Sequence, residues 1–159
     1  MVSKVMFGSM PRERTDMETI VVERTIAAPP EEVFDWCAIT TNYERTVWVL
    51  RDKLTRPGEG AAYGVGAIRL HTWLIGRFHE RITRYDPPHS FDYIVDRSFP
   101  SIPHTGATMT FTPTPGGTRV VWASTVDVGP IVGRIARTVV GHVFGRILDA
   151  CAKDLATKR

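Results

Sequence analysis

The feature that most constrains the fold is a long amphipathic helix predicted at the C-terminal end of a chain that otherwise has the pattern of strands and turns. From Pro130 to about Thr157, apolar residues recur every three to four positions, which places their side chains on one face of an α-helix. Pro130 suits the first helical turn, where its missing N–H is not needed. One long helix after many strands indicates a strand layer curled around that helix, an arrangement that commonly leaves a cavity. The predicted apolar face consists of Val132, Ala136, Val139, Val140, Val143, Ile147, Ala150 and Cys151.

Seven segments before this helix have the composition of β-strands, with β-branched and aromatic residues between turns that contain Gly or Pro. After the first strand, Pro30 with Glu31 and Glu32 begins a short helix, since acidic residues are favourable at its positive end. A second short helical turn follows at 40–45. This order predicts an α+β fold in which six to seven antiparallel strands form a curved sheet around the C-terminal helix. The strand segments are 18–26, 47–54, 67–74, 77–85, 90–96, 106–112 and 118–127.

The length of 159 residues suits one domain with a substantial core. We expect that domain to span 18–159, after a loose N-terminal tail at 1–17. The tail lacks the apolar stretch of a signal peptide, and no window approaches eighteen consecutive apolar residues. We therefore expect a cytoplasmic protein without stable membrane insertion.

Charge and cysteine content exclude several classes of function. The formal net charge is only +3 and no block of Lys or Arg occurs, so nucleic-acid binding is not expected. Cys37 and Cys151 lie far apart in predicted helices, without CxxC or Cys/His ligand spacing, so we expect two buried free thiols and no metal site. The chain has no nucleotide-binding loop either, and no cofactor is expected.

Strand alternation predicts which side chains face the interior, because successive residues of a strand point to opposite faces. In the last three strands the apolar residues fall on one face, and this face is assigned to the core. The inward sets are Phe91, Tyr93 and Val95; Met109 and Phe111; and Val120, Trp122, Ser124 and Val126.

The hairpin at 67–85, which turns at Gly76, is harder to orient. Its first strand has a more apolar face with Ile68, Leu70, Thr72 and Leu74, so Arg69, His71 and Trp73 are predicted to point outward. In the second strand, Phe78 and Ile82 bring Glu80 inward with them. A carboxylate in such surroundings is partly desolvated, which raises its pKa and makes Glu80 a candidate acid or base. The alternative is that Glu80 lies near the sheet rim and pairs with an arginine.

The histidines and two helical glycines offer weaker signals. His71 and His79 are predicted to face solvent, which argues against a histidine-pair metal site. His142 falls at the edge of the helix face, and one option for His104, which follows Pro103 in a loop, is the mouth of a cavity. Gly141 and Gly145 lie one turn apart on the predicted outer side of the helix, which indicates either a contact with a second copy in a homodimer or an exposed face that tolerates glycine.

Three motifs, in order along the chain, resemble segments of the START-like, helix-grip superfamily, often called SRPBCC. The segment 28–34, APPEEVF, resembles its strand-to-helix opening, and 116–122, GGTRVVW, resembles the turn and strand before its C-terminal helix. The segment 80–93, ERITRYDPPHSFDY, resembles the hairpin and turn of its polyketide cyclase/dehydrase and lipid transport branch. The resemblance covers about 18–157 and implies an internal cavity for a hydrophobic molecule such as a lipid, sterol or polyketide-like compound.

The sequence is compatible with three functions. The first is a carrier or sensor that binds a hydrophobic ligand in the cavity, with a mostly apolar lining and a few polar groups. The second is a cyclase or dehydratase that uses Glu80 as general acid or base, although the arginine that such enzymes carry on this strand corresponds to Arg69, predicted to point outward. The third is a protein-interaction module with a vestigial cavity. The predicted ligand-binding residues are Leu70, Thr72, Phe78, Ile82, Tyr93, Met109, Phe111 and Trp122.

Overall fold

The computed structural model describes residues 16–159, and its helices and strands follow the predicted order. The predicted tail at 1–17 falls outside the described residues except for its end, where Met17 already begins the first strand. The elements are β1 (Met17–Ile26), α1 (Pro30–Ala38), the 3₁₀-helix η1 (Thr40–Arg45), β2 (Val49–Arg56), β3 (Ile68–Trp73), β4 (Gly76–Asp86), β5 (Ser90–Phe99), β6 (His104–Thr114), β7 (Gly117–Asp127) and α2 (Pro130–Thr157).

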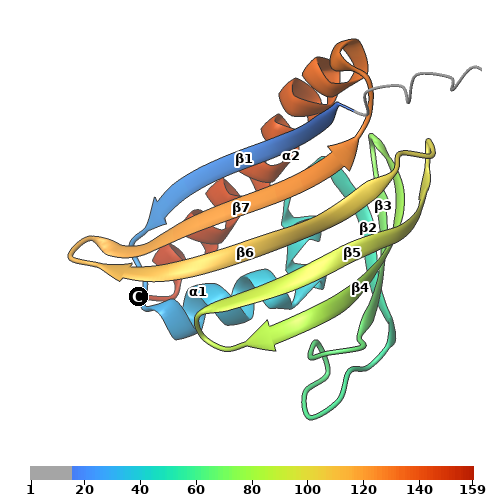
Figure 1. Ribbon diagram of the computed structural model, residues 1–159. Helices are drawn as coiled ribbons and strands as arrows, with labels where there is room; N and C mark the ends of the chain where they lie inside the picture. Colours follow the sequence, from blue (N-terminus) through green and yellow to red (C-terminus); the bar gives the residue numbers. More distant parts are fainter. Residues whose placement is uncertain (1–15) are drawn as a thin grey trace, which may run out of the picture.

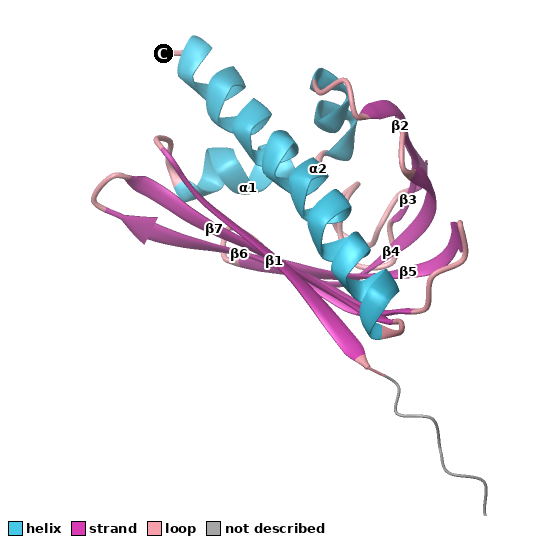
Figure 2. Ribbon diagram, turned by 90° about the horizontal axis from the view of Figure 1, so that it is seen from above, coloured by secondary structure: helices cyan, strands magenta, loops and turns pink. Residues whose placement is uncertain are grey.

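All seven strands form one antiparallel sheet in the order β1-β7-β6-β5-β4-β3-β2. Figure 1 views this sheet with α2 behind β1 and β7, and Figure 2 shows the sheet curving around α2 while α1 lies against the same concave side. The predicted α+β fold, a curved sheet around a long C-terminal helix with two short helices after the first strand, is therefore confirmed.

The predicted face of α2 is confirmed in part: Ala136, Val143, Ile147 and Cys151 are buried, but the buried face is rotated from the predicted one. Val132 and Val139 are 49% and 39% exposed, whereas Phe144 and Leu148 are buried. Gly145, predicted on the outer side, is also buried. A Cβ at Gly145 would lie 2.8 Å from the Arg24 guanidinium of β1, so the small residues let the helix approach this edge strand. The buried face of α2 is rotated toward β1 relative to the predicted face, because close packing against a strand selects small residues as well as apolar ones. The buried face consists of Gly133, Ala136, Val143, Phe144, Gly145, Ile147, Leu148, Cys151 and Leu155.

The centre of the core is aromatic. The rings of Trp122 and Phe144 stack with centroids 3.7 Å apart, which joins β7 to α2. Phe34 of α1 packs edge-on against Phe91 and Phe111 at 5.7 and 5.2 Å. Such pairs add about 0.5–1.5 kcal/mol beyond the burial of their area. These rings fill the core between the sheet, α1 and α2, and Phe144 also borders the pocket described below.

The two cysteines meet between α1 and α2. Cys37 and Cys151 are both buried and free. Burial raises the pKa of the Cys37 thiol well above its usual value, and the neighbouring Cys151 thiol adds to this effect. Cys37 is thus protonated at neutral pH, and both side chains pack as small buried groups.

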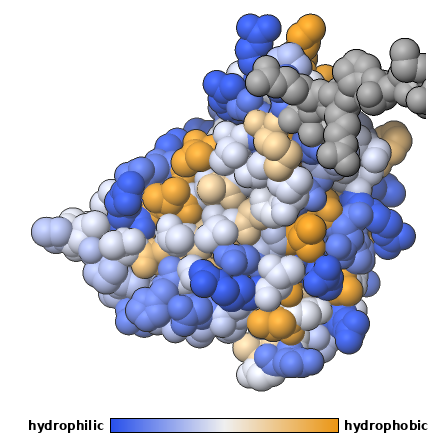
Figure 3. All heavy atoms as spheres, in the orientation of Figure 1, coloured by the Kyte–Doolittle hydropathy of each residue, from blue (hydrophilic) through white to orange (hydrophobic). Residues whose placement is uncertain are grey.

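The outer face of the sheet is mainly polar. Figure 3 shows it as a hydrophilic surface with separate hydrophobic spots rather than one continuous apolar area. Arginine–carboxylate pairs cross this face, such as Arg119 with Glu23 at 2.5 Å. In the described part of the chain, no helix combines the length and the apolar character needed to cross a membrane.

Candidate functional site

Strand β3 faces the interior with the opposite side from the predicted one, whereas the predicted inward face of β4 is confirmed. Arg69, His71 and Trp73 are 1%, 2% and 8% exposed, while Leu70 on the other face is 37% exposed. Directly paired residues of antiparallel strands share a face, and Arg69 pairs with Glu80. Since Glu80 points inward, as predicted, Arg69 must do so too. Choosing the more hydrophobic face of β3 as the inner one was wrong, because charged side chains can be buried where opposite charges neutralise one another.

These inward side chains form a closed cluster of four ionisable groups. The Arg69 guanidinium donates to Oε1 of Glu80, and Nε2 of His71 lies 3.3 Å from Oε2 of the same carboxylate. Nδ1 of His71 bonds the carboxylate of Asp52 on β2. Thr40 of η1 donates to the other Asp52 oxygen at 2.7 Å. Two cations and two anions thus compensate one another in a site where a single charge would be costly.

The cluster sets the protonation states of its members. Burial alone raises the pKa of Glu80, but Arg69 and His71 outweigh it and bring the value down to about 2. Burial alone lowers the pKa of His71, but Glu80 and Asp52 outweigh it and raise the value to about 9. The predicted upward shift for Glu80 is therefore wrong. The alternative was right about an arginine partner but wrong about the rim, since Glu80 is 6% exposed.

Aromatic rings enclose the cationic member. The Arg69 guanidinium carbon lies 5.4 Å from the ring centroids of both Phe91 and Tyr93. Nη1 of Arg69 also donates to the carbonyl of Ala38 at 3.3 Å, which ties β3 to the end of α1. Arg69 is thus a fixed part of the core beneath Glu80.

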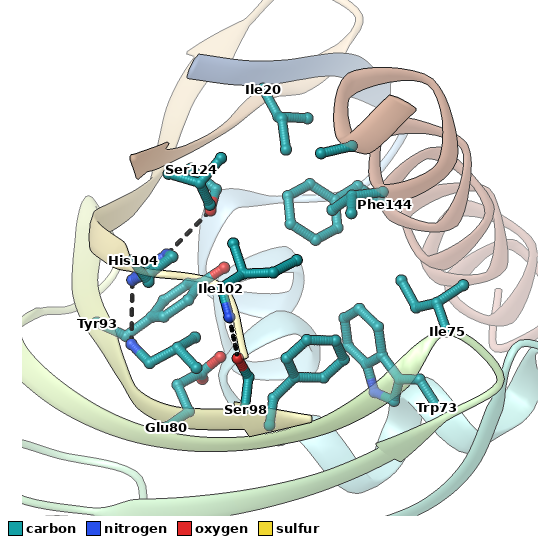
Figure 4. A pocket seen from close by; sticks show the side chains of 15 residues that line it. Ile20, Trp73, Ile75, Glu80, Tyr93, Ser98, Ile102, His104, Ser124 and Phe144 are labelled. Atoms are coloured by element: carbon teal, nitrogen blue, oxygen red, sulfur yellow. Dashed lines mark hydrogen bonds between the residues drawn. The ribbon is translucent and has the colours of Figure 1, made fainter. Parts of the chain in front are cut away.

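Next to this cluster, a partly open pocket of about 70 Å³ lies between the sheet and α2. Figure 4 shows its two sides: polar groups from the strands, among them Glu80, Tyr93, His104 and Ser124, face apolar side chains that include Phe144. The complete lining is Ile20, Trp73, Ile75, Phe78, Glu80, Tyr93, Val95, Ser98, Ile102, His104, Ser124, Val126, Ala136, Val140 and Phe144. The pocket is apolar on the helix side and offers hydrogen-bonding groups on the sheet side.

His104 lies beside this pocket, at the place where strands β5 and β6 separate. Strands β5 and β6 pair only from Ser90 to Tyr93 on β5. Beyond that point, the Val95 N–H donates to Nδ1 of His104 at 3.0 Å, and Nε2 of His104 lies 3.0 Å from Oγ of Ser124. Nδ1 accepts a hydrogen bond, so the ring is neutral with its proton on Nε2. Burial lowers the pKa of His104, although the Glu80 charge opposes this shift.

The residues predicted to bind a ligand fall into three groups. Phe78 and Tyr93 line the pocket, together with Glu80. Ile82, Met109, Phe111 and Trp122 are buried in the packed core and do not line it. Leu70 and Thr72 lie on the outer face of β3, so their predicted inward orientation was wrong. The inward sets of the last three strands are confirmed by burial or by their place in the pocket lining.

Several residues of the pocket lining were not predicted from the sequence, and for others the sequence indicated only a possible position. Trp73, Ile75, Ser98 and Phe144 line the pocket without having been singled out. His104 is at the pocket, the position offered as one option for it. His142 packs edge-on against Trp48 with centroids 5.2 Å apart and does not line the pocket. For Trp73, the available signal was the pairing register of the hairpin, counted from its turn at Gly76.

Within residues 16–159, no group of three or more His, Cys, Asp or Glu side chains has an arrangement suited to a metal ion. The side chains at the pocket offer one ionised carboxylate, hydroxyl groups and a neutral imidazole beside an apolar wall. Such an arrangement can bind and orient a small molecule.

A curved antiparallel sheet that encloses a long C-terminal helix, with a pocket between them, defines a helix-grip protein. The sequence matches the family described as polyketide cyclase / dehydrase and lipid transport over residues 17–158. The chain belongs to this family, and the resemblance to the SRPBCC superfamily is confirmed. No curated protein matches the sequence significantly.

Solved structures of low sequence identity share the fold. A protein from Thermus thermophilus is 20% identical, with a TM-score of 0.63 over 85% of this chain and 92% of its own. The protein Ara h 8.0201 is 13% identical, with a TM-score of 0.69 over 89% of this chain and 99% of its own. The two-domain ARO/CYC protein StfQ of the steffimycin biosynthetic pathway is 18% identical, with a TM-score of 0.62 over 84% of this chain and 43% of its own. At these identities the similarity concerns the fold alone.

Proposed function

We propose that this protein binds a hydrophobic small molecule between its sheet and α2 and acts as a carrier or sensor of that molecule. The observation that carries the proposal is the pocket itself, which is apolar along α2 and has a few hydrogen-bonding groups on the sheet. Ligand sites in proteins commonly have this composition. The family description, which includes lipid transport, supports the same class of ligand.

The size of the pocket limits what it accommodates. Its volume of about 70 Å³ is well below the roughly 300–1,000 Å³ of typical ligand pockets. Most of a single ring or of a short alkyl group fits inside the pocket. A larger ligand has to extend through the open side of the pocket.

The test is to recover a ligand and to exclude it by filling the pocket. The protein is purified from its native cells, extracted with organic solvent and analysed by mass spectrometry. Ala136→Phe fills the pocket from α2 and should abolish the bound compound, while Ala156→Phe on the exposed part of the same helix should retain it. Absence of any compound from the wild-type protein, or equal retention by Ala136→Phe, contradicts the proposal.

A second candidate is an enzyme of the cyclase or dehydratase type, favoured by the buried carboxylate that faces the pocket. With a pKa of about 2, Glu80 is ionised at neutral pH. It cannot donate a proton there, and as a base it is weak. Its role would be to orient a polar substrate group. Incubation with a reactive poly-β-keto thioester tests this candidate: an unchanged distribution of cyclised products with and without protein excludes it.

A further inference from the structure

The polar groups of the pocket come from three strands of the sheet and have unused hydrogen-bonding capacity. Glu80 lies on β4, Tyr93 on β5, and Ser124 on β7, and all three line the pocket. In Figure 4 the Glu80 side chain lies below the Tyr93 ring, with His104 and Ser124 beyond it. Because the facing wall is apolar, a ligand can satisfy its polar group only on this side.

Glu80 supplies an acceptor. A carboxylate has about four lone-pair sites on its two oxygens. Among residues 16–159, one donor approaches each oxygen: Arg69 at Oε1 and His71 at Oε2. Capacity for a further donor remains on the side that borders the pocket. A ligand N–H or O–H therefore finds a charged acceptor, which makes a stronger hydrogen bond than a neutral one.

The hydroxyl groups of Tyr93 and Ser124 supply a donor. The Tyr93 oxygen accepts from Nε1 of Trp122 at 2.7 Å, and the Ser124 oxygen accepts from Nε2 of His104 at 3.0 Å. Both hydroxyl oxygens act as acceptors in these two bonds, and among residues 16–159 neither hydroxyl proton has an assigned acceptor. An oxygen of the ligand is the group that would accept one of them.

The charges near the pocket disfavour an anionic ligand. Arg69 and His71 are already neutralised by Glu80 and Asp52, so no positive charge in this cluster is left for a carboxylate. The Glu80 carboxylate would repel a second anion at the polar wall. The neutral His104 ring adds no positive charge. A fatty acid or aromatic acid in its ionised form is thus poorly matched to this wall.

We infer that the pocket selects a neutral, mainly apolar molecule that carries a hydroxyl group, an alcohol or a phenol, whose oxygen accepts from Tyr93 or Ser124 and whose proton is donated to Glu80. The inference rests on the proposed function, since it names the polar group of the ligand that the pocket takes. Ethers lack the hydroxyl proton that Glu80 would accept. Hydrocarbons lack both this proton and the oxygen, and carboxylates carry a negative charge that Glu80 repels.

Four single-ring compounds of similar size separate these cases: p-cresol, 4-methylanisole, toluene and benzoate. Their dissociation constants for the wild-type protein are measured by isothermal titration calorimetry at pH 7.5. We expect p-cresol to bind about tenfold or more tightly than toluene and 4-methylanisole, the effect of one hydrogen bond to a charged group, and benzoate to bind most weakly. Equal binding of toluene and p-cresol, or tightest binding of benzoate, overturns this inference but leaves the proposed function standing. Absence of binding by all four compounds contradicts both.

A double variant locates the donor. Tyr93→Phe with Ser124→Ala removes both hydroxyl groups, and we expect it to weaken p-cresol binding about tenfold while toluene binding stays unchanged. Tyr85→Phe is the matched control, because Tyr85 does not line the pocket and its loss should leave both affinities as in the wild type. Unchanged p-cresol binding by a folded double variant overturns the assignment of the donor. If the double variant does not fold, the comparison of the four compounds on the wild-type protein decides.

Discussion

Two histidines lie near the same carboxylate, His71 buried and His104 half-buried, and their surroundings give them different charge states. His71 lies between Asp52 and Glu80, and its pKa is raised to about 9, so it is an imidazolium at neutral pH. His104 lies between the Val95 N–H and the Ser124 hydroxyl, and burial lowers its pKa. The more deeply buried histidine is the charged one, so the direct partners of the two ring nitrogens decide the charge more than depth does.

The largest expected effect comes from removing a charge in the His71 region. Arg69→Met leaves Glu80 buried with one cation fewer, and we expect a loss of about 3–5 kcal/mol in the free energy of unfolding, measured by urea denaturation at pH 7. Arg119→Met breaks the pair with Glu23, whose side chains are both about half exposed, and should change stability far less. Equal effects of the two substitutions would mean that the cluster is not a buried, compensated unit.

A second prediction concerns alkaline pH. The folded-state pKa of His71 is raised from 6.5 to about 9, so its contribution to stability is complete below pH 6.5 and is lost as the pH rises through 9. The shift corresponds to roughly 3 kcal/mol. Chemical denaturation at several pH values between 6.5 and 9.5 measures it, and His71→Gln should remove this part of the slope. Parallel profiles for the two proteins would contradict the charged state of His71.

The third prediction concerns mildly acidic pH and His104. The pKa of His104 is lowered by burial, so its contribution is present above the unfolded value of about 6.5 and is lost as the pH falls through the folded value. The groups that face its ring are Glu80, Tyr93 and Ser124. A protonated ring can no longer accept from the Val95 N–H, at a cost of about 1 kcal/mol.

His104→Gln is the matched variant for this effect, because an amide offers one acceptor and one donor but does not titrate. Between pH 7 and 5 the wild type should lose stability relative to His104→Gln, as measured by thermal unfolding. The opposite order would show that the ring is charged in the folded protein and that the contrast with His71 is wrong.

The smallest effect is expected on the outer face of β3. Leu70→Thr alters a side chain that is 37% exposed and lies between Arg69 and His71 in the sequence. We expect a change within about 0.5 kcal/mol, measured by the same denaturation experiment. A loss above about 1.5 kcal/mol would indicate that Leu70, rather than its neighbours, faces the core.

Most of the fold was predictable because its signals are local. Prolines and glycines mark the ends of the strands, and the helical spacing after Pro130 gave α2 the bounds that the structure shows. The inward faces of β5, β6 and β7 followed from alternation, since polar and apolar residues separate cleanly there. The helix face was less predictable, because glycines that allow close approach to β1 carry no hydrophobic signal.

The site was predictable only in part, because hydrophobicity fails where charges compensate one another. Arg69 and His71 appear as outward residues on any scale that treats each side chain alone. Register carries the missing information: counting outward from the turn pairs Arg69 with Glu80 and His71 with Phe78, so the inward assignment of Glu80 and Phe78 already implied their partners. The partners of His104 come from two other strands, and no pattern within one strand indicates them.

The Val95 amide is held by an imidazole where a neighbouring strand would normally supply a carbonyl. In a regular sheet, exchange of an amide proton with deuterated water requires two strands to separate. For Val95, rotation of one side chain is sufficient. The exchange rate of this single amide therefore reports the orientation of His104 directly, and it gives a spectroscopic probe of the pocket that needs no label and no ligand.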